Sequence, residues 1–255
     1  MKNIKKSAII TGGGTGVGAA TAKRLVNDGW CVTISGRRQE KLDKVLAEIG
    51  QPDRTLAVPG DVTNRDDVQE LINAHLEKFG RLDGLVNNAA VAIGGPIGQV
   101  SVEDWKTVMS INIDGVFNTI NLAVEHLEKV SGAIVNVSSV SGERGDFGFS
   151  PYCASKGAVS NFTRSLSLEL GPKKVRINGV APALTDTDMA TFVTESEAMM
   201  AKIRDRMPLG RAAKPEEIAA PIAFLLSDDA SMITGAILPV DGGTMASNGQ
   251  PNFIG

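Results

Sequence analysis

Short apolar stretches alternate with helix-like segments along most of the chain. The apolar stretches, rich in aliphatic and β-branched residues, are 7–11 (SAIIT), 31–36 (CVTISG), 55–60 (TLAVPG), 82–90 (LDGLVNNAA), 132–139 (GAIVNVSS), 175–182 (VRINGVAP) and 235–243 (GAILPVDGG). Between them lie segments with apolar residues at helical spacing, such as 39–50, where Gly50 is suited to end the helix. Strands that are apolar throughout are typical of a parallel sheet with helices on both faces. The pattern therefore predicts an α/β fold, a single doubly wound (Rossmann-type) domain with a parallel sheet of about seven strands.

The domain organisation follows from what interrupts this alternation. The chain shows no linker, low-complexity tract or solenoid repeat, so we expect residues 1–255 to form one dinucleotide-binding and catalytic domain. Residues 186–212 break the pattern and predict a substrate-loop insertion at the carboxyl edge of the sheet, where ligands bind in such folds. Residues 246–255 form a turn-rich tail.

Composition and charge narrow the function classes. The net charge is −3 with acids and bases mixed along the chain, which argues against a nucleic-acid-binding face. The two cysteines have no metal-ligand spacing and cannot form a disulfide framework. The N-terminal apolar stretch is too short for a signal-peptide core, and no apolar run is long enough to span a membrane. We therefore expect a cytoplasmic protein with no metal, nucleic-acid or membrane partner.

A glycine-rich turn, TGGGTGVG (11–18), joins the first predicted strand to the first helix. Glycine allows left-handed backbone angles and close approach of a ligand, and the helix N-terminus that follows suits a pyrophosphate. The spacing Gly12, Gly16, Gly18 differs from the usual G-x-G-x-x-G and lacks the ending of a P-loop. The turn, with Thr15 and Val17, predicts a dinucleotide-binding site.

The end of the second strand indicates which dinucleotide binds. Dinucleotide folds that prefer NAD place an acid near this point for the ribose 2′-hydroxyl. This chain has Arg37 and Arg38 there instead, and guanidinium groups pair with a 2′-phosphate. We expect NADP(H) to be preferred over NAD(H).

The only tyrosine, Tyr152, stands four residues before Lys156 in the segment YCASK. In a helix this spacing puts both side chains on one face. A free phenol has a pKa of about 10, and a nearby ammonium would lower that pKa towards the range useful for proton transfer. The pair predicts an acid–base site.

The motifs together resemble those of the classical short-chain dehydrogenase/reductases over essentially the whole chain. The motifs, in family order and spacing, are TGGGTGVG (11–18), NNAA (87–90), NVSS (136–139), YCASK (152–156) and VAPALTDT (180–187). The resemblance implies that Tyr152 exchanges a proton with the carbonyl or alcohol oxygen and that Ser139 hydrogen-bonds the same oxygen. It also implies that Lys156 binds the nicotinamide ribose, that Asn112 holds a water linking Lys156 to solvent, and that the protein is a homotetramer.

The resemblance further implies cofactor contacts beyond the glycine turn. These are Asp61 and Val62 at the adenine, Asn88, Ala89 and Ala90 at the ribose, and Pro182, Ala183, Thr185 and Thr187 at the carboxamide. Three positions depart from the family pattern: Ala90 and Ala183 replace glycines, and Thr185 stands where isoleucine or valine is common. We expect these departures to shift the pose of the cofactor slightly without preventing binding.

The favoured function is an NADP(H)-dependent oxidoreductase interconverting a small-molecule ketone and a secondary alcohol, as a carbonyl reductase. Within the family, a 3-oxoacyl-thioester reductase and a sugar or polyol dehydrogenase stay open. Phe147, Phe149, Met189, Phe192 and Met199 offer an apolar lid, whereas Lys202, Arg204, Arg206 and Arg211 are available for an acyl carrier.

Functions of other classes have less support in the sequence. A serine hydrolase would need a histidine base, but His75 and His126 are expected on helix surfaces or between helices, and no G-x-S-x-G elbow is present. Metal-dependent alcohol oxidation would need a Cys/His cluster, which the sequence lacks. A catalytically silent NADP-binding sensor is disfavoured by the complete Asn112, Ser139, Tyr152 and Lys156 set.

Overall fold

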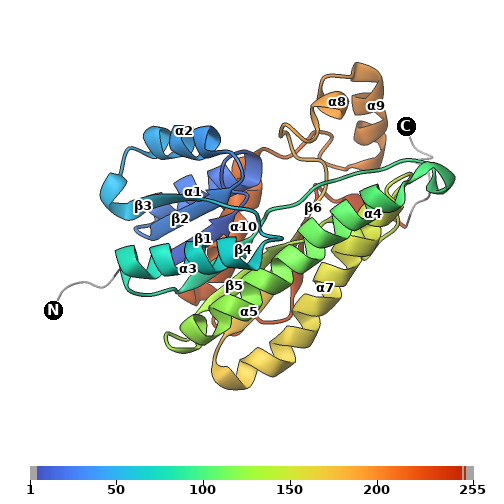
Figure 1. The fold of residues 1–255 in the computed structure, drawn as a ribbon. Helices are drawn as coiled ribbons and strands as arrows, with labels where there is room; N and C mark the ends of the chain where they lie inside the picture. Colours follow the sequence, from blue (N-terminus) through green and yellow to red (C-terminus); the bar gives the residue numbers. More distant parts are fainter. Residues whose placement is uncertain (1–4, 249, 251–255) are drawn as a thin grey trace.

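The computed structural model describes residues 5–248 and 250, and its centre is a seven-stranded parallel sheet (Figure 1). The strands are β1 (Ser7–Thr11), β2 (Cys31–Gly36), β3 (Thr55–Pro59), β4 (Gly84–Asn87), β5 (Ala133–Val137), β6 (Arg176–Pro182) and β7 (Ile237–Val240). Their order is β3-β2-β1-β4-β5-β6-β7, and in register Ala8 of β1 lies opposite Val32 of β2 and Gly84 of β4. The predicted single doubly wound domain is confirmed.

Helices cover both faces of this sheet. The helices are α1 (Gly16–Asn27), α2 (Gln39–Ile49), α3 (Arg65–Phe79), α4 (Val102–Met109), α5 (Gly115–Glu128), α6 (Val140–Glu143), α7 (Ser150–Leu170), α8 (Thr191–Thr194), α9 (Glu197–Arg206) and α10 (Pro215–Leu226). Figure 1 shows α3, α5 and α7 in front of the sheet and α1 and α10 behind it. Successive strand residues point to opposite faces, so Ile10 packs with α1 and α10 whereas Ile9 packs with α3 and α5.

Two local signals from the sequence account for helix boundaries. Gly50 follows α2 with a left-handed φ of 66°, and its N–H donates to the Leu46 carbonyl, as a C-terminal glycine does. Ser101 caps α4, where its Oγ accepts from the Asp104 N–H at 2.9 Å and donates to the Asp104 carboxylate at 2.7 Å.

The segment between β6 and α10 stands apart from the layered body. It contains α8 and α9, which project beyond the carboxyl edge of the sheet (Figure 1). Both helices fall within 186–212, and the role of this segment as a substrate loop stays a prediction. Of the predicted tail, 246–255, residues 249 and 251–255 lie outside the described residues.

A buried polar chain ties the sheet to its front helices below the carboxyl edge. Thr119 of α5 donates to Asn87 at 2.6 Å, Asn87 donates to Asn136 at 2.8 Å, and Asn136 donates to Thr163 of α7 at 2.8 Å. Because buried polar groups are costly unless paired, this chain fixes α5 and α7 relative to β4 and β5.

His75 occupies a different environment from the one expected. It is fully buried between α3 and the sheet, where its ring nitrogens lie 3.1 Å from Ser7 Oγ and 2.7 Å from Thr33 Oγ1. The helical spacing located His75 on α3 but carried no information about the two strand hydroxyls that face it. Burial lowers the pKa of His75 from 6.5 to about 4, so the ring is neutral at physiological pH.

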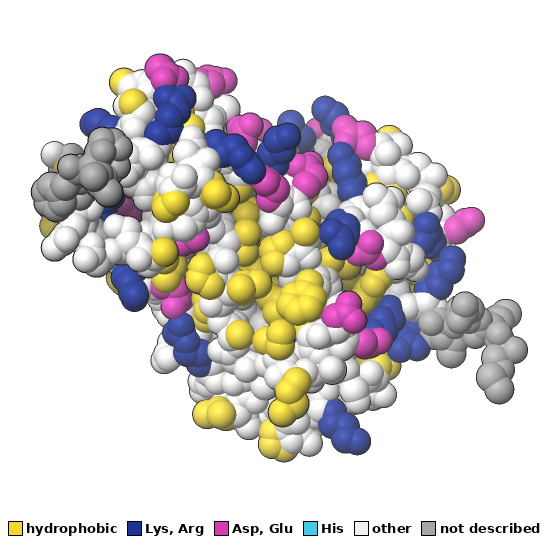
Figure 2. Space-filling model, turned by 180° about the vertical axis from the view of Figure 1, so that it is seen from behind, with side chains coloured by type: hydrophobic (Ala, Val, Ile, Leu, Met, Phe, Trp, Pro, Cys, Tyr) yellow, Lys and Arg dark blue, Asp and Glu magenta, His cyan; other side chains and the backbone are white. Residues whose placement is uncertain are grey.

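The surface gives two further observations. No helix in the described part of the chain is long and apolar enough to cross a membrane, and residues 5–248 and 250 contain no group of three or more side chains able to hold a metal ion. The face seen from behind carries hydrophobic side chains at its centre and charged ones around them (Figure 2). Exposed hydrophobic residues on α10 and β7 include Phe224 and Leu238.

Candidate active site

A cleft of about 390 Å³ runs along the carboxyl edge of the sheet, between the ends of the central strands and the segment after β6. All the predicted site residues except Gly18 and Asn112 line it: Gly12, Thr15, Gly16, Val17, Arg37, Arg38, Asp61, Val62, Asn88, Ala89, Ala90, Ser139, Tyr152, Lys156, Pro182, Ala183, Thr185 and Thr187. Residues from five separate motifs therefore meet in one cavity, as the carboxyl edge of a doubly wound sheet predicts.

The glycine turn forms one wall of this cleft with its backbone. Gly12 has a φ of 64°, and a Cβ there would lie 2.9 Å from the Ala89 Cα. Gly18 does not face the cleft, because it packs under the turn, where a Cβ would lie 2.2 Å from the Gly12 carbonyl oxygen. Only glycine fits either position, and the close packing brings the N-terminus of α1 to the cleft.

The N-terminus of α1 has the electrostatics of an anion site. Thr15 precedes the helix without a side-chain cap hydrogen bond, and the first turn contains no acidic residue. The free backbone N–H groups and the helix dipole therefore face the cleft with a positive partial charge. These residues fit the pyrophosphate of a dinucleotide.

Three cations gather where β2 meets α2. Arg37 and Arg38 are exposed, and Lys41, one turn further on, is half-buried and lines the same part of the cleft. On the opposite side lie Asp61 and Val62, and the Asp61 carboxylate accepts from the Thr63 N–H and hydroxyl at 2.9 and 2.8 Å. The donor set fits a phosphorylated ribose beside an adenine.

Tyr152 and Lys156 lie on the same face of α7, and Ser139 follows β5 beside them. Lys156 Nζ lies 5.8 Å from the centroid of the Tyr152 ring and donates to the Val137 carbonyl at 2.7 Å. The Ser139 hydroxyl lies beside the Tyr152 phenol, close enough to lower the pKa of the phenol. Ser139, Tyr152 and Lys156 therefore lie together in one part of the cleft.

The protonation states of this triad follow mainly from burial. Burial raises the pKa of Tyr152 above 10, and the hydrogen bond from Ser139 acts in the opposite direction. Lys156 is 3% exposed, and burial lowers its pKa from 10.5 to about 8. The sequence predicted that the ammonium would bring the phenol pKa below its ordinary value. In the structure the pKa of Tyr152 is raised instead, because the charged form of a buried group loses its hydration.

Asn112 lies in a π-helical turn, η3 (Ser110–Asp114), between α4 and α5, and its side chain is fully buried. Its amide accepts from the Val91 N–H at 2.9 Å and donates to the Val91 carbonyl at 2.9 Å and to Ser155 Oγ at 3.0 Å. The amide is thus occupied by protein groups, and it joins the loop after β4 to the helix that carries Tyr152.

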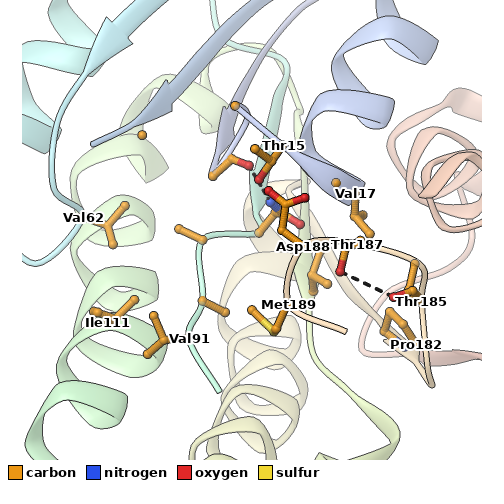
Figure 3. A pocket seen from close by; sticks show the side chains of 18 of the residues that line it. Thr15, Val17, Val62, Val91, Ile111, Pro182, Thr185, Thr187, Asp188 and Met189 are labelled. Carbon is orange, nitrogen blue, oxygen red and sulfur yellow. Dashed lines mark hydrogen bonds between the residues drawn. The ribbon is translucent and has the colours of Figure 1, made fainter. Parts of the chain in front are cut away.

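The segment after β6 closes the cleft on the side of α1. Thr187 packs so near the glycine turn that a Cβ at Gly16 would lie 2.9 Å from it, and its hydroxyl hydrogen-bonds the Thr185 carbonyl at 3.4 Å (Figure 3). Of the family departures, Ala90 and Ala183 add methyl groups to the cleft wall, and Thr185 is buried with its hydroxyl on the Ala183 carbonyl.

Several lining residues were not predicted as site residues. Val91 and Ile111 face the cleft from one side, and Asp188 lies near Thr15 (Figure 3). Met189, which the sequence offered as part of an apolar lid, faces the cleft from the other side. Lys41 is signalled by its position one helical turn after Arg37. Ile111 has no such signal, because its orientation depends on the π-helical turn.

Comparisons with known proteins point to one enzyme family. Residues 12–245 match the family profile described as "Enoyl-(Acyl carrier protein) reductase". The chain is 44% identical over 254 residues to meso-2,3-butanediol dehydrogenase of Serratia marcescens, covering 100% of both chains. It is 38% identical over 245 residues to a 3-oxoacyl-(acyl-carrier-protein) reductase of Thermotoga maritima, covering 95% of this chain and 99% of the relative.

A solved structure extends the likeness to three dimensions. The chain resembles a variant of actinorhodin polyketide ketoreductase, solved with NADPH, with a TM-score of 0.90 and 32% identity over 94% of this chain and 97% of that one. The family match, the near-complete coverage and the shared fold show that this protein belongs to the short-chain dehydrogenase/reductase family of oxidoreductases, which interconvert C=O and CH–OH groups.

Proposed function

We propose that this protein is an NADP(H)-dependent carbonyl reductase that acts on small ketones, with Tyr152 as the acid–base residue. The observation that carries the proposal is the meeting of Ser139, Tyr152 and Lys156 in one cleft with the glycine turn and Arg37. A proton donor thus lies in the same cavity as a cradle for a phosphorylated dinucleotide.

The chemistry of reduction follows from the placement of these groups. A reduced nicotinamide cofactor, when held in the cleft, would supply the hydride that the carbonyl carbon accepts. The Tyr152 phenol donates its proton to the carbonyl oxygen, on which negative charge develops, and a phenol with a raised pKa is protonated and ready for this at neutral pH. Ser139 donates a hydrogen bond to the same oxygen and fixes its position. In alcohol oxidation the phenolate accepts the proton instead.

Lys156 and Asn112 support the phenol in different ways. Lys156 is anchored by the Val137 carbonyl, and from there it binds the nicotinamide ribose and favours the phenolate as the proton leaves. Asn112 braces the floor of the site through Val91 and Ser155, whose hydroxyl donates to the Tyr152 carbonyl at 2.8 Å. The Asn112 amide is already hydrogen-bonded to protein groups. Its participation in a water-mediated proton path therefore stays a prediction.

The preference for NADP(H) rests on the cations at the end of β2. Arg37, Arg38 and Lys41 line the cleft where the 2′-phosphate of an adenosine ribose would lie, and no acid occupies that strand end. The related polyketide ketoreductase was solved with NADPH.

The substrate class rests on the wall beside Tyr152. Val91, Ile111 and Met189 make this part of the cleft apolar, which suits a small ketone or hydroxyketone better than a sugar. The Serratia marcescens relative, named for a four-carbon diol, points in the same direction.

An acyl-carrier substrate is the second candidate, because the Thermotoga maritima relative is named for one. Two of the four cations that it would use are paired with acids: Arg204 with Glu197, and Arg211 in a two-pronged pair with Glu217. These pairs favour the small-ketone reading.

We also propose a homotetramer located in the cytoplasm. Two separate faces expose large hydrophobic side chains: Trp105, Phe117 and Leu168 on α4, α5 and α7, and Phe224 and Leu238 on α10 and β7. Two apolar faces allow two dimer contacts, which together build a tetramer of twofold symmetry. Both cysteines are free thiols, as is usual in a reducing compartment.

The experiment that tests the proposal is a panel of small ketones, hydroxyketones, sugars and acyl thioesters, assayed with NADPH and separately with NADH by nicotinamide absorbance. We expect the highest kcat/KM for a small ketone with NADPH. Binding of NADPH without turnover of any panel member would favour the silent sensor instead.

A further inference from the structure

Ser139 begins a helix that is too short to be stable alone. It is the N-cap of α6, a helix of four residues, and its Oγ accepts from the Ser141 N–H at 3.1 Å. Because a single helical turn is not stable in isolation, the position of α6 must be set by contacts with the rest of the protein. The position of the Ser139 hydroxyl depends on the same contacts.

Those contacts come from one stripe of α7. Tyr152, Lys156, Ser160 and Arg164 are spaced four residues apart, which places them in a row along one face of the helix. The segment 138–143 lies along this row. The near end of the row carries the proposed acid–base residue, and the far end carries a guanidinium.

In the middle of the row, at Lys156 and Ser160, hydrogen bonds and close packing hold the segment on α7. Ser138 Oγ lies 3.1 Å from the Lys156 carbonyl oxygen and 2.7 Å from Ser160 Oγ. Gly142 lies directly on α7, where a Cβ would come within 2.6 Å of the Lys156 carbonyl carbon.

At the far end of the row, an ion pair holds the last residue of the segment. Arg164 Nη2 donates to Glu143 Oε2 at 2.6 Å, and the Glu143 side chain is only 13% exposed whereas that of Arg164 is 46% exposed. The other carboxylate oxygen, Oε1, is buried with no hydrogen-bond partner among the described residues. The guanidinium is therefore the group that holds this nearly buried carboxylate in place.

We propose that the Glu143–Arg164 pair is a positioning clamp that holds α6 against α7 and thereby keeps the Ser139 hydroxyl on the Tyr152 phenol. Neither residue lines the cleft. The inference rests on the proposed function, because it assigns the clamp to the geometry of the Ser139–Tyr152 pair. Loss of the guanidinium leaves a buried carboxylate unpaired, and α6 must then move to hydrate it.

The test uses Arg164, whose half-exposed side chain allows substitution without opening the core. Arg164→Gln removes the charge, and Arg164→Lys keeps a cation. Arg24→Gln is the matched control, because Arg24 is 45% exposed and bonds Asp28 at 2.8 Å within α1, away from α6. Tyr152→Phe is assayed in parallel.

For Arg164→Gln we expect kcat to fall about tenfold with KM for NADPH unchanged, because a small displacement of a positioned group costs turnover more than binding. The pH profile of alcohol oxidation should also move to higher pH, since the Ser139 hydrogen bond favours the phenolate. Arg164→Lys should keep most of kcat and the pH profile, and Arg24→Gln should match the wild type.

Three results would overturn the clamp: an Arg164→Gln enzyme that behaves like Arg24→Gln, a loss of kcat without a shift of the pH profile, or an Arg164→Lys enzyme as impaired as Arg164→Gln. Turnover retained in Tyr152→Phe would instead show that the proposed function itself is wrong.

Discussion

Lys156 Nζ donates a 2.7 Å hydrogen bond to the Val137 carbonyl at the end of β5, and this bond holds the ammonium under the Tyr152 ring. The strand thus fixes the cation, and the helix fixes the phenol relative to the cation. Burial makes the charged forms of Tyr152 and Lys156 costly. The protonation of both groups should therefore respond to a charge that a bound molecule brings into the cleft.

Ser139→Ala tests how the phenol is tuned. We expect kcat to fall about 100-fold, because the oxygen that receives the proton loses a hydrogen-bond donor. The Ser139 hydrogen bond lowers the pKa of Tyr152, so its loss raises that pKa further. Alcohol oxidation needs the phenolate, so the pH at which its kcat increases should be higher in the variant than in the wild type. A profile of kcat against pH measures this shift. An unshifted pH profile would show that Ser139 does not influence the pKa of Tyr152.

Arg37→Ala in combination with Arg38→Ala tests the choice of cofactor. We expect the affinity for NADPH to fall about 150-fold or more, since hydrogen bonds to charged groups each contribute about 1.5–3 kcal/mol and the double variant loses two of them. The affinity for NADH should change little, because it lacks the 2′-phosphate. Titration of nicotinamide fluorescence measures both constants. An equal loss for the two cofactors would show that the arginines do not read the phosphate.

The sequence predicted the sheet well because its signals are local. The stretch CVTISG forms β2 at the predicted residues, and SAIIT forms β1. The same holds for the glycine turn and the Tyr152–Lys156 spacing, where chain geometry alone places the groups.

Features that depend on tertiary packing could not be predicted from such local signals. The hydrogen bonds of Asn112 to Val91 and Ser155 depend on a π-helical turn, which has no sequence signal of its own. The raised pKa of Tyr152 depends on how deeply the ring is buried, which is a property of the folded cleft. The two strand hydroxyls that face His75 come from residues far away in sequence.

His75→Gln tests the pH dependence of stability. The pKa of His75 is about 4 in the folded protein and 6.5 when exposed, so the unfolded chain binds a proton in this range and the folded chain does not. Stability is therefore lost as pH falls from 6.5 to about 4, by roughly 3.4 kcal/mol at most for this group.

Urea unfolding at a series of pH values measures that slope in both proteins. The variant should be less stable at pH 7, by about 1–3 kcal/mol, because Ser7 and Thr33 lose their ring partner. Its free energy of unfolding should nevertheless fall less steeply than that of the wild type in the acid range. Parallel slopes would contradict a neutral, buried imidazole.

Tyr152→Phe tests the central claim most directly, because it removes one oxygen atom from the chain's only phenol. The measurement is NADPH oxidation with the best ketone of the panel, paired with NADPH affinity by fluorescence. The account predicts a loss of kcat of about 1,000-fold, within the range for a removed acid–base group, with the affinity for NADPH nearly unchanged. A variant that retains wild-type turnover would contradict it.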